Sequence, residues 1–456
     1  MARVLLIRPL CASDEQEFAE PLGIERLAGY LRAHGIGDVR IFDRRLYAKR
    51  RQLAAMATGL PTFWQDVDAA YGQDPPTHVG ISLMTSADLP DALRILSRVA
   101  ARFPHAAVCA GGVFVTTNTR EARRLLPQHV LLVLGEGEAP MLAWAQSDSE
   151  HPASTPAHAP ISPNDWVPAY RPDLASYAAL GCAVNLQTSR GCPGSCAFCA
   201  TPRLPEPYRR WQPRDLDLVA DEIEYEATRL AAVAHLPIFN VVDDDFGPLS
   251  RVEALAESLQ ERKLAVSFAL EMRMASLVGQ PRLAQRLSRL RKAGLTRVFV
   301  GVESIDERTL RSWNKPYDVS RLPSVVDAFG HAGIALQAGY ILWHAHQSVA
   351  SAKDEVERLW RLGIYTHRMA LSRLIAFSGT GLSPQAACLS TSAQTFYDTF
   401  ATRSADLTEA WMAAAIEEPH AAAVAHLTGD DARLIELQQT LEDINHRSYL
   451  LWHKLA

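Results

Sequence analysis

The alternation of short β-branched runs with amphipathic helical patterns constrains the fold of this chain more than any other feature. In residues 1–145, helical patterns separate five such runs, and Ile24, Ala28 and Leu31 mark the apolar face of one helix that closes at Gly35. Strands that alternate with helices form a parallel sheet. We therefore predict a doubly wound, Rossmann-like α/β domain, with strands at residues 4–7, 39–43, 79–83, 107–110 and 130–134.

The same alternation returns in residues 183–385, after a stretch rich in Pro, Ser and Ala at residues 146–182 that we interpret as a linker. Six β/α units are fewer than the eight of a closed barrel, so we predict a partial, laterally open (β/α)6 barrel. Residues 386–456 are predicted to be helical. The expected barrel strands are residues 183–188, 238–242, 265–270, 297–302, 335–342 and 369–376.

Composition and charge exclude several classes of partner. The 456-residue chain has a formal net charge of −5, which argues against nucleic acid or an anionic membrane as its main partner. No run of 18 apolar residues is present, so no transmembrane helix is expected. The N-terminal apolar run is too short for a secretory signal. We therefore expect a cytoplasmic chain that binds neither nucleic acid nor membrane.

Three of the seven cysteines lie close together, on the loop after the first strand of the second domain. Cys192, Cys196 and Cys199 have the spacing C-x3-C-x2-C, which lets one loop aim three thiolates at a common point. Three thiolates on a [4Fe–4S] cluster leave one iron open for another molecule. The alternative is a structural zinc site, which needs four closed ligands and would have to recruit Cys182 from the other end of a strand.

Small or polar residues follow the strands of the first domain. In doubly wound sheets, ligands bind beyond the carboxyl ends of the strands, and glycine lets a large ligand approach the backbone closely. The alternative is that these glycines merely end the strands. The candidate pocket residues are Ser82, Thr85, Gly111, Gly112, Gly135 and Glu136.

The cysteine motif, with Phe198 before its third cysteine, together with the predicted six-unit barrel, resembles the radical S-adenosylmethionine (SAM) superfamily. This resemblance implies that the three cysteines hold a [4Fe–4S] cluster whose open iron binds SAM. The cluster would cleave SAM to methionine and a 5′-deoxyadenosyl radical, which abstracts hydrogen from the substrate. The residues implied to contact SAM are Phe198, Asp244, Arg273, Glu303 and Ser304.

The first domain is similar to the cobalamin (B12)-binding domain that precedes the barrel in one large radical SAM subfamily. The segments PLGIERLAGYLRAHG, VGISLMTS, AGGVF and GEGE carry this similarity, and the six pocket residues would then line a cobalamin-type pocket. The chain lacks the D-x-H-x-x-G motif after its first strand, so no histidine is placed there to coordinate cobalt. The use of cobalamin stays open at this point.

Three functions compete. Length and layout are similar to a radical SAM diol-dehydratase of aminoglycoside biosynthesis, which favours radical dehydration at C3′ of a substrate such as paromamine. This implies an electron donor such as flavodoxin or ferredoxin, and an NADPH-dependent reductase as a partner. The alternative is a cobalamin-dependent radical SAM methyltransferase of secondary metabolism, and the third is a cluster-binding protein that is not an enzyme. The candidate catalytic or substrate-binding residues, which could instead pack at the barrel rim, are Asp243, Glu271, Tyr340 and His344.

Overall fold

The computed structural model describes residues 2–11, 18–53, 62–147, 161–204, 208–375, 380–382 and 387–455. The chain forms two compact units. The first comprises Met1–Tyr177 with Leu204–Tyr208, and the second comprises Ala178–Arg203 with Arg209–Ala456. Each unit is described by itself.

The first unit contains a five-stranded parallel sheet in the order β2-β1-β3-β4-β5. The apolar run Val4–Ile7, on an inner strand of this sheet, is almost fully buried because helices cover both faces of the sheet. This confirms the predicted doubly wound domain. The strands are β1 (Arg3–Arg8), β2 (Asp38–Asp43), β3 (His78–Ser82), β4 (Ala107–Gly111) and β5 (Leu131–Leu132).

Two hydrophobic cores lie on opposite faces of this sheet. One core contains residues of α1 and α7 together with Val4 and Leu6, and the other contains residues of α3 and α4 together with Leu5 and Ile7. Helix α1 ends where predicted, since Gly35 has a φ of +92°, which favours glycine. The helices are α1 (Leu22–Ala33), α2 (Arg44–Leu53), α3 (Phe63–Tyr71), α4 (Leu89–Arg102), α5 (Val113–Thr117), α6 (Thr119–Leu125) and α7 (Glu138–Gln146).

The described part of the predicted linker packs onto the first unit. Arg171 is 1% exposed and forms ion pairs with Glu20 and Glu25. The amide of Tyr170 donates to the carbonyl oxygen of Glu25 at 2.9 Å. A buried guanidinium without these carboxylates would be strongly destabilising. The first compact unit therefore includes the described part of this segment and extends to Tyr177.

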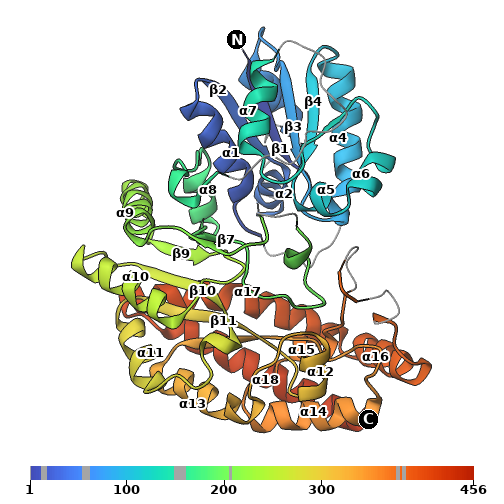
Figure 1. Ribbon diagram of the computed structural model, residues 1–456, viewed down its shortest axis with the longest axis vertical. Helices are drawn as coiled ribbons and strands as arrows, with labels where there is room; N and C mark the ends of the chain where they lie inside the picture. The colour runs from blue at the N-terminus through green and yellow to red at the C-terminus, as the bar shows by residue number, and fades with distance from the viewer. Residues whose placement is uncertain are drawn as a thin grey trace. The chain divides into compact units, whose positions relative to one another are not determined.

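The second unit contains a parallel sheet in the order β12-β11-β10-β9-β6, with a helix after each of the strands β9, β10, β11 and β12 (Figure 1). A short antiparallel pair, β7 (Ser189–Arg190) with β8 (Gln212–Pro213), follows β6. The strands are β6 (Val184–Leu186), β9 (Ile238–Val241), β10 (Ser267–Arg273), β11 (Leu295–Glu303) and β12 (Ala335–Tyr340). The helices are α8 (Leu174–Ala179), which begins in the first unit, α9 (Leu216–Ala232), α10 (Leu249–Glu261), α11 (Leu283–Lys292), α12 (Glu307–Ser312), α13 (Leu322–Ala332) and α14 (Val349–Arg361).

The sixth barrel strand, predicted at residues 369–376, is wrong for its described part. That part contains the end of helix α15 (His367–Leu371) and one isolated parallel bridge between Trp343 and Arg373. A helical turn forms here in place of a strand because the Thr366 side chain caps it and the amide of His367 donates to the Asn445 side chain at 2.8 Å. Residues 376–379, which include the end of the predicted strand, lie outside the described residues.

The C-terminal region is helical as predicted, with α16 (Thr391–Arg403), α17 (Ala405–Thr428) and α18 (Ala432–Leu455). Helix α17 packs against β10 and β11 as well as α18. Trp452 of α18 is fully buried and contacts Trp343 and Phe400. Among the described residues, no helix is both long and apolar enough to cross a membrane.

Candidate functional site

The cysteine loop begins at a position that only glycine fits. Gly191 has a φ of +70°, and a Cβ atom there would lie 2.5 Å from the carbonyl oxygen of Arg210. The amide of Cys192 donates to the carbonyl oxygen of Arg209 at 3.3 Å. The Cys192 Sγ in turn accepts from the Gly194 amide at 3.3 Å. The segment just before β8 thus fixes the direction in which the loop leaves the sheet.

A second segment, Trp313–Lys315, holds the part of the loop between the cysteines. The Asn314 side-chain amide donates to the carbonyl oxygen of Ser195 at 3.1 Å and to its Oγ at 2.6 Å. The Ala197 amide donates to the carbonyl oxygen of Trp313 at 2.8 Å. The ring of Phe198 meets the Trp313 ring edge-on, with centroids 5.5 Å apart. Sequence reasoning missed this segment because it has no spacing relation to the cysteines.

Two cations lie near the thiols. Arg273 ends β10, and its Nε lies 3.5 Å from the position that a Cβ of Gly194 would take. Burial raises the pKa of Cys192 to about 11, while the Gly194 amide and Arg273 act in the opposite direction. Burial also raises the pKa of Cys196, opposed by Lys315 and Arg273. Cys196 is thus buried and Cys192 and Cys199 are half-buried, with cations near the first two of these thiols that favour the thiolate form.

The choice between zinc and a cluster rests on the number of ligands that the chain offers. Among the described residues, no three His, Cys, Asp or Glu side chains gather closely enough to bind one metal ion, and this holds for the three loop cysteines as well. Cys182 precedes β6, whereas the cysteine loop follows it, so a fourth thiolate is not supplied. Three cysteines on one loop suit a [4Fe–4S] cluster better, because each thiolate then binds a different iron.

Glu303 lies at a strained position at the end of β11. Its φ is +65°, rare for a residue other than glycine, and the pairing with β12 shifts register between Gly301 and Glu303. Its carboxylate pairs with Lys315 at 2.6 Å, and both side chains are 12% exposed. A Cβ atom on Gly301 would lie 2.4 Å from the Lys315 ammonium. Gly301 therefore makes room for the ion pair, while Ser304, the other predicted residue, is buried beside it.

Asp243 supports the stem of the cysteine loop. Its buried carboxylate accepts from the Thr188 amide at 2.7 Å, from the Thr188 hydroxyl at 2.6 Å and from the Ser189 hydroxyl at 2.8 Å. Burial raises the pKa of Asp243 to about 6, against the effect of these hydrogen bonds. Asp244 is exposed and accepts from the Thr201 hydroxyl at 3.3 Å. Contact of Asp243 with substrate, and of Asp244 with SAM, stay predictions.

The remaining catalytic candidates occupy different environments. Tyr340 is buried, and its hydroxyl bonds to Glu355 and accepts from the Ile305 amide at 3.3 Å. Burial and the neighbouring Glu355 raise the pKa of Tyr340 well above its usual value. His344 is buried against Trp313, with ring centroids 5.2 Å apart, and burial lowers its pKa to about 4. Glu271 is half-buried on β10, so of these three it is the one placed on an open strand face.

In the first unit, two predicted pocket glycines are required by the packing of the chain itself. Gly112 has a φ of +103°, and a Cβ there would lie 2.4 Å from the Leu83 carbonyl oxygen. Gly135 has a φ of +72°, and a Cβ there would lie 2.7 Å from the Tyr208 ring. For these two residues, the alternative interpretation that glycine is needed where a strand ends is enough to explain why glycine is present.

The other four pocket residues are half-buried at the carboxyl edge of the sheet: Ser82, Thr85, Gly111 and Glu136. The loops after β3 and β4 also expose two apolar side chains, Met84 at 49% and Val113 at 47%. Exposed apolar side chains beside polar ones suit a large ligand of mixed polarity. The edge therefore has the mixed polarity that a cobalamin ligand would need.

Ion pairs fix the backbone at the same edge, and sequence reasoning missed them. Arg45 pairs with the buried Asp88 at 2.7 Å, and Asp88 also accepts from the Thr85 amide at 3.0 Å. Arg44 pairs with Asp91 at 2.7 Å. Long-range ion pairs leave no periodic signal in a sequence. They hold the loop after β3 in one conformation.

Comparison with known proteins assigns both units. Residues 186–345 match the radical SAM superfamily. Residues 12–145 match the B12 binding domain. The chain therefore carries a radical SAM domain preceded by a B12-binding domain. The radical SAM domain takes a [4Fe–4S] cluster and SAM as cofactors, and the B12-binding domain indicates cobalamin as the third cofactor.

Relatives and solved structures agree with this assignment. An anaerobic magnesium-protoporphyrin IX monomethyl ester cyclase of Rubrivivax gelatinosus is 26% identical over 386 residues, 77% of this chain and 64% of the relative. A hopanoid C-3 methylase of Methylococcus capsulatus is 23% identical over 363 residues, 76% of this chain and 64% of the relative. The chain thus spans slightly less than two thirds of the length of these relatives.

Among solved structures, the cobalamin-dependent SAM radical enzyme OxsB has a TM-score of 0.72 at 15% identity, covering 100% of this chain and 79% of OxsB. The radical SAM methyltransferase TsrM of Kitasatospora setae has a TM-score of 0.60 at 17% identity, covering 80% of this chain and 72% of TsrM. At these identities the likeness shows a shared fold.

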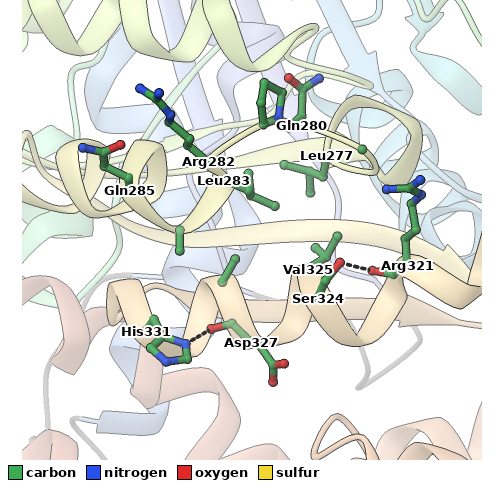
Figure 2. Close-up of a pocket in the computed structure, with 14 residues that line it drawn as sticks. Leu277, Gln280, Arg282, Leu283, Gln285, Arg321, Ser324, Val325, Asp327 and His331 are labelled. Atoms are coloured by element: carbon green, nitrogen blue, oxygen red, sulfur yellow. Dashed lines mark hydrogen bonds between the residues drawn. The ribbon is translucent and has the colours of Figure 1, made fainter.

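A pocket of about 830 Å³ lies between the start of α11 and one face of α13 (Figure 2). It is lined by residues of the segments 277–285 and 321–331, including Gln285, Arg321 and His331. None of the residues predicted from the sequence lines it. The pocket is therefore distinct from the cysteine loop.

Proposed function

We propose that the chain is a cobalamin-dependent radical SAM methyltransferase that acts on a small molecule. The observation that carries this proposal is the cysteine loop with Arg273 and the Lys315–Glu303 pair around it, in a chain that also contains a B12-binding domain. When bound, the cluster and SAM supply a 5′-deoxyadenosyl radical, and cobalamin supplies a methyl group.

The residues of the chain would bind and orient these groups. Cys192, Cys196 and Cys199 would hold the cluster, and Arg273 would pair with the SAM carboxylate. Phe198, fixed edge-on against Trp313, would pack beside the adenine. The hydrogen bonds from Thr188 and Ser189 to Asp243 would keep the loop stem in place during turnover.

Relatives support methyl transfer over the predicted dehydration. Two curated relatives are named methyltransferase or methylase and three are named cyclase, and none of the five is named as a dehydratase. Dehydration of an aminoglycoside such as paromamine, with an NADPH-dependent reductase as partner, therefore has no support from them. A reductant for the cluster, such as flavodoxin or ferredoxin, is needed for either reaction.

The test is anaerobic reconstitution with iron, sulfide and hydroxocobalamin, followed by desalting and metal analysis. We expect about one cobalt and four irons per chain. Turnover with methyl-labelled SAM should then place label in a product that is heavier by one CH2 unit. Full iron loading without retained cobalt, or a product lighter by one water, would overturn methyl transfer and favour dehydration.

A further inference from the structure

Strand register brings a set of polar residues onto one face of the second unit's sheet. Asn185, Asn240 and Arg297 lie on one row across β6, β9 and β11, with Ala269 and Ala335 between and beside them. Because side chains alternate along a strand, the next row on the same face lies two residues further on. That row contains Glu271, Phe299 and Gln337, and the row after it contains Arg273, Gly301 and Gly339.

Hydrogen bonds link the polar side chains of the first two rows. Arg297 donates to the Gln337 side-chain oxygen at 3.0 Å and to the Asn240 side-chain oxygen at 3.4 Å. Asn240 in turn donates to the Asn185 side-chain oxygen at 3.3 Å. The chain of contacts therefore crosses β6, β9, β11 and β12 on a single face.

This face is open where the opposite face is closed. Val298, Val300 and Val302 of β11 are fully buried on the opposite face. Gln337, by contrast, is exposed, and Glu271, Arg297 and Asn240 are half-buried. A sheet face that packs in a dry core would carry apolar side chains, because burying polar groups costs free energy. Among the positions of these rows, Phe299 is the single large apolar side chain.

The face ends at a helix on one side and at the cysteine loop on the other. Helix α17 packs against β10 and β11. Burial raises the pKa of Glu418 on this helix, and the positive charge of Arg297 acts against that rise. Glu418 therefore lies near Arg297 in the first row. From Arg297 to Glu303 is six residues along β11, or roughly 20 Å. Arg273 and Glu303 mark the end beside the cysteine loop.

We propose that this polar face binds a hydrophilic substrate that offers several hydroxyl or amino groups. Gln337, Glu271 and the Arg297–Asn240 pair would recognise these groups, since together they offer both hydrogen-bond donors and acceptors. This substrate class rests on the proposed function for its chemistry, but the recognition itself needs no turnover. Arg297, Asn240 and Gln337 are substrate-binding residues in this proposal.

The test uses two ring compounds that share a carbon skeleton and differ in their hydroxyl groups, myo-inositol and cyclohexanol. Saturation-transfer NMR on the full chain, reconstituted with iron and sulfide and supplied with SAM, should show transfer to myo-inositol and little to cyclohexanol. Gln337→Leu removes hydrogen bonds at similar volume and should lower the myo-inositol signal at least about fivefold. Gln285→Leu, on the outer pocket of Figure 2, is the matched control and should leave the signal unchanged.

Stronger transfer to cyclohexanol, no transfer to myo-inositol, or an unchanged signal in Gln337→Leu would overturn the proposal. If Gln337→Leu fails to fold by circular dichroism, Asn240→Leu provides the same test on the neighbouring strand. Binding is read without turnover, so a chain that binds myo-inositol but retains no cobalt would refute methyl transfer and keep the substrate class. A chain that methylates an apolar substrate would refute the substrate class and keep methyl transfer.

Discussion

Replacing Gly191 by alanine should open the cysteine loop without touching a cysteine. Alanine at a φ of +70° costs about 1–2 kcal/mol. The new Cβ would also lie 2.5 Å from the Arg210 carbonyl oxygen, and a backbone atom cannot move away cheaply. We expect the Cys192–Arg209 hydrogen bond and one bond of the β7–β8 pair to be lost, at about 1 kcal/mol each.

Gly363 provides the control, because it has the same φ of +70° but nothing within 4 Å of the position of a Cβ atom. Gly363→Ala should therefore cost the backbone strain alone. The extra 2 kcal/mol or so in Gly191→Ala should speed amide exchange in residues 189–199 about 30-fold relative to Gly363→Ala, measured by hydrogen–deuterium exchange on the chain without iron. Equal exchange in this segment for the two variants would refute the reasoning.

Three further predictions concern the same unit. Alanine at any one of Cys192, Cys196 or Cys199 should abolish both SAM cleavage and most of the iron–sulfur absorbance, whereas Cys388→Ser should leave both intact; deoxyadenosine formation in a cysteine variant would contradict the assignment. Lys315→Met and Glu303→Gln should each lower the free energy of unfolding in urea by about 2 kcal/mol, because each leaves a buried charge unpaired. The double variant should lose less than the sum of the two single losses. A loss equal to that sum would show that the two side chains are not coupled. Burial raises the pKa of Asp243 from 3.8 to about 6, so the folded chain takes up this proton at a higher pH than the unfolded chain does. As the pH falls from about 6 to 4, the free energy of unfolding should therefore rise by about 3 kcal/mol at most. The same pH profile of stability in Asp243→Asn would count against this reasoning.

The sequence predicted the strands whose apolar side chains are buried on at least one face of a sheet. The predicted run at residues 4–7 became β1, and the one at residues 297–302 became the centre of β11, since helices cover at least one face of each. The wrong prediction of a strand at residues 369–376 has the same cause, because it also relied on an apolar run. Met369 and Ala370 are buried and apolar, as a strand would need, but Thr366 and Asn445 fix a helical turn there. Apolar runs record burial and do not specify the backbone that is buried.

The candidate site was predictable only where its residues lie within one short segment. The spacing of the three cysteines is visible in eight residues of sequence, and the acidic run after β9 is visible in three. The groups that hold the loop are not. Asn314 reaches Ser195 across 119 positions, and Asp243 reaches Thr188 across 55. Such pairs exist only once the parallel sheet has brought the ends of its strands together.

This dependence has a consequence for how the site forms. The cysteine loop spans few residues, yet its conformation is set by β8, by the end of β9 and by the Trp313–Lys315 segment after α12. None of these contacts is local, so a peptide containing only the cysteine motif would lack the hydrogen bonds to Ser195 and Asp243 that order it. The loop should therefore acquire its shape when β9 and β11 have paired with β10, and the strained Glu303 is tolerated because the same pairing and Lys315 determine its position.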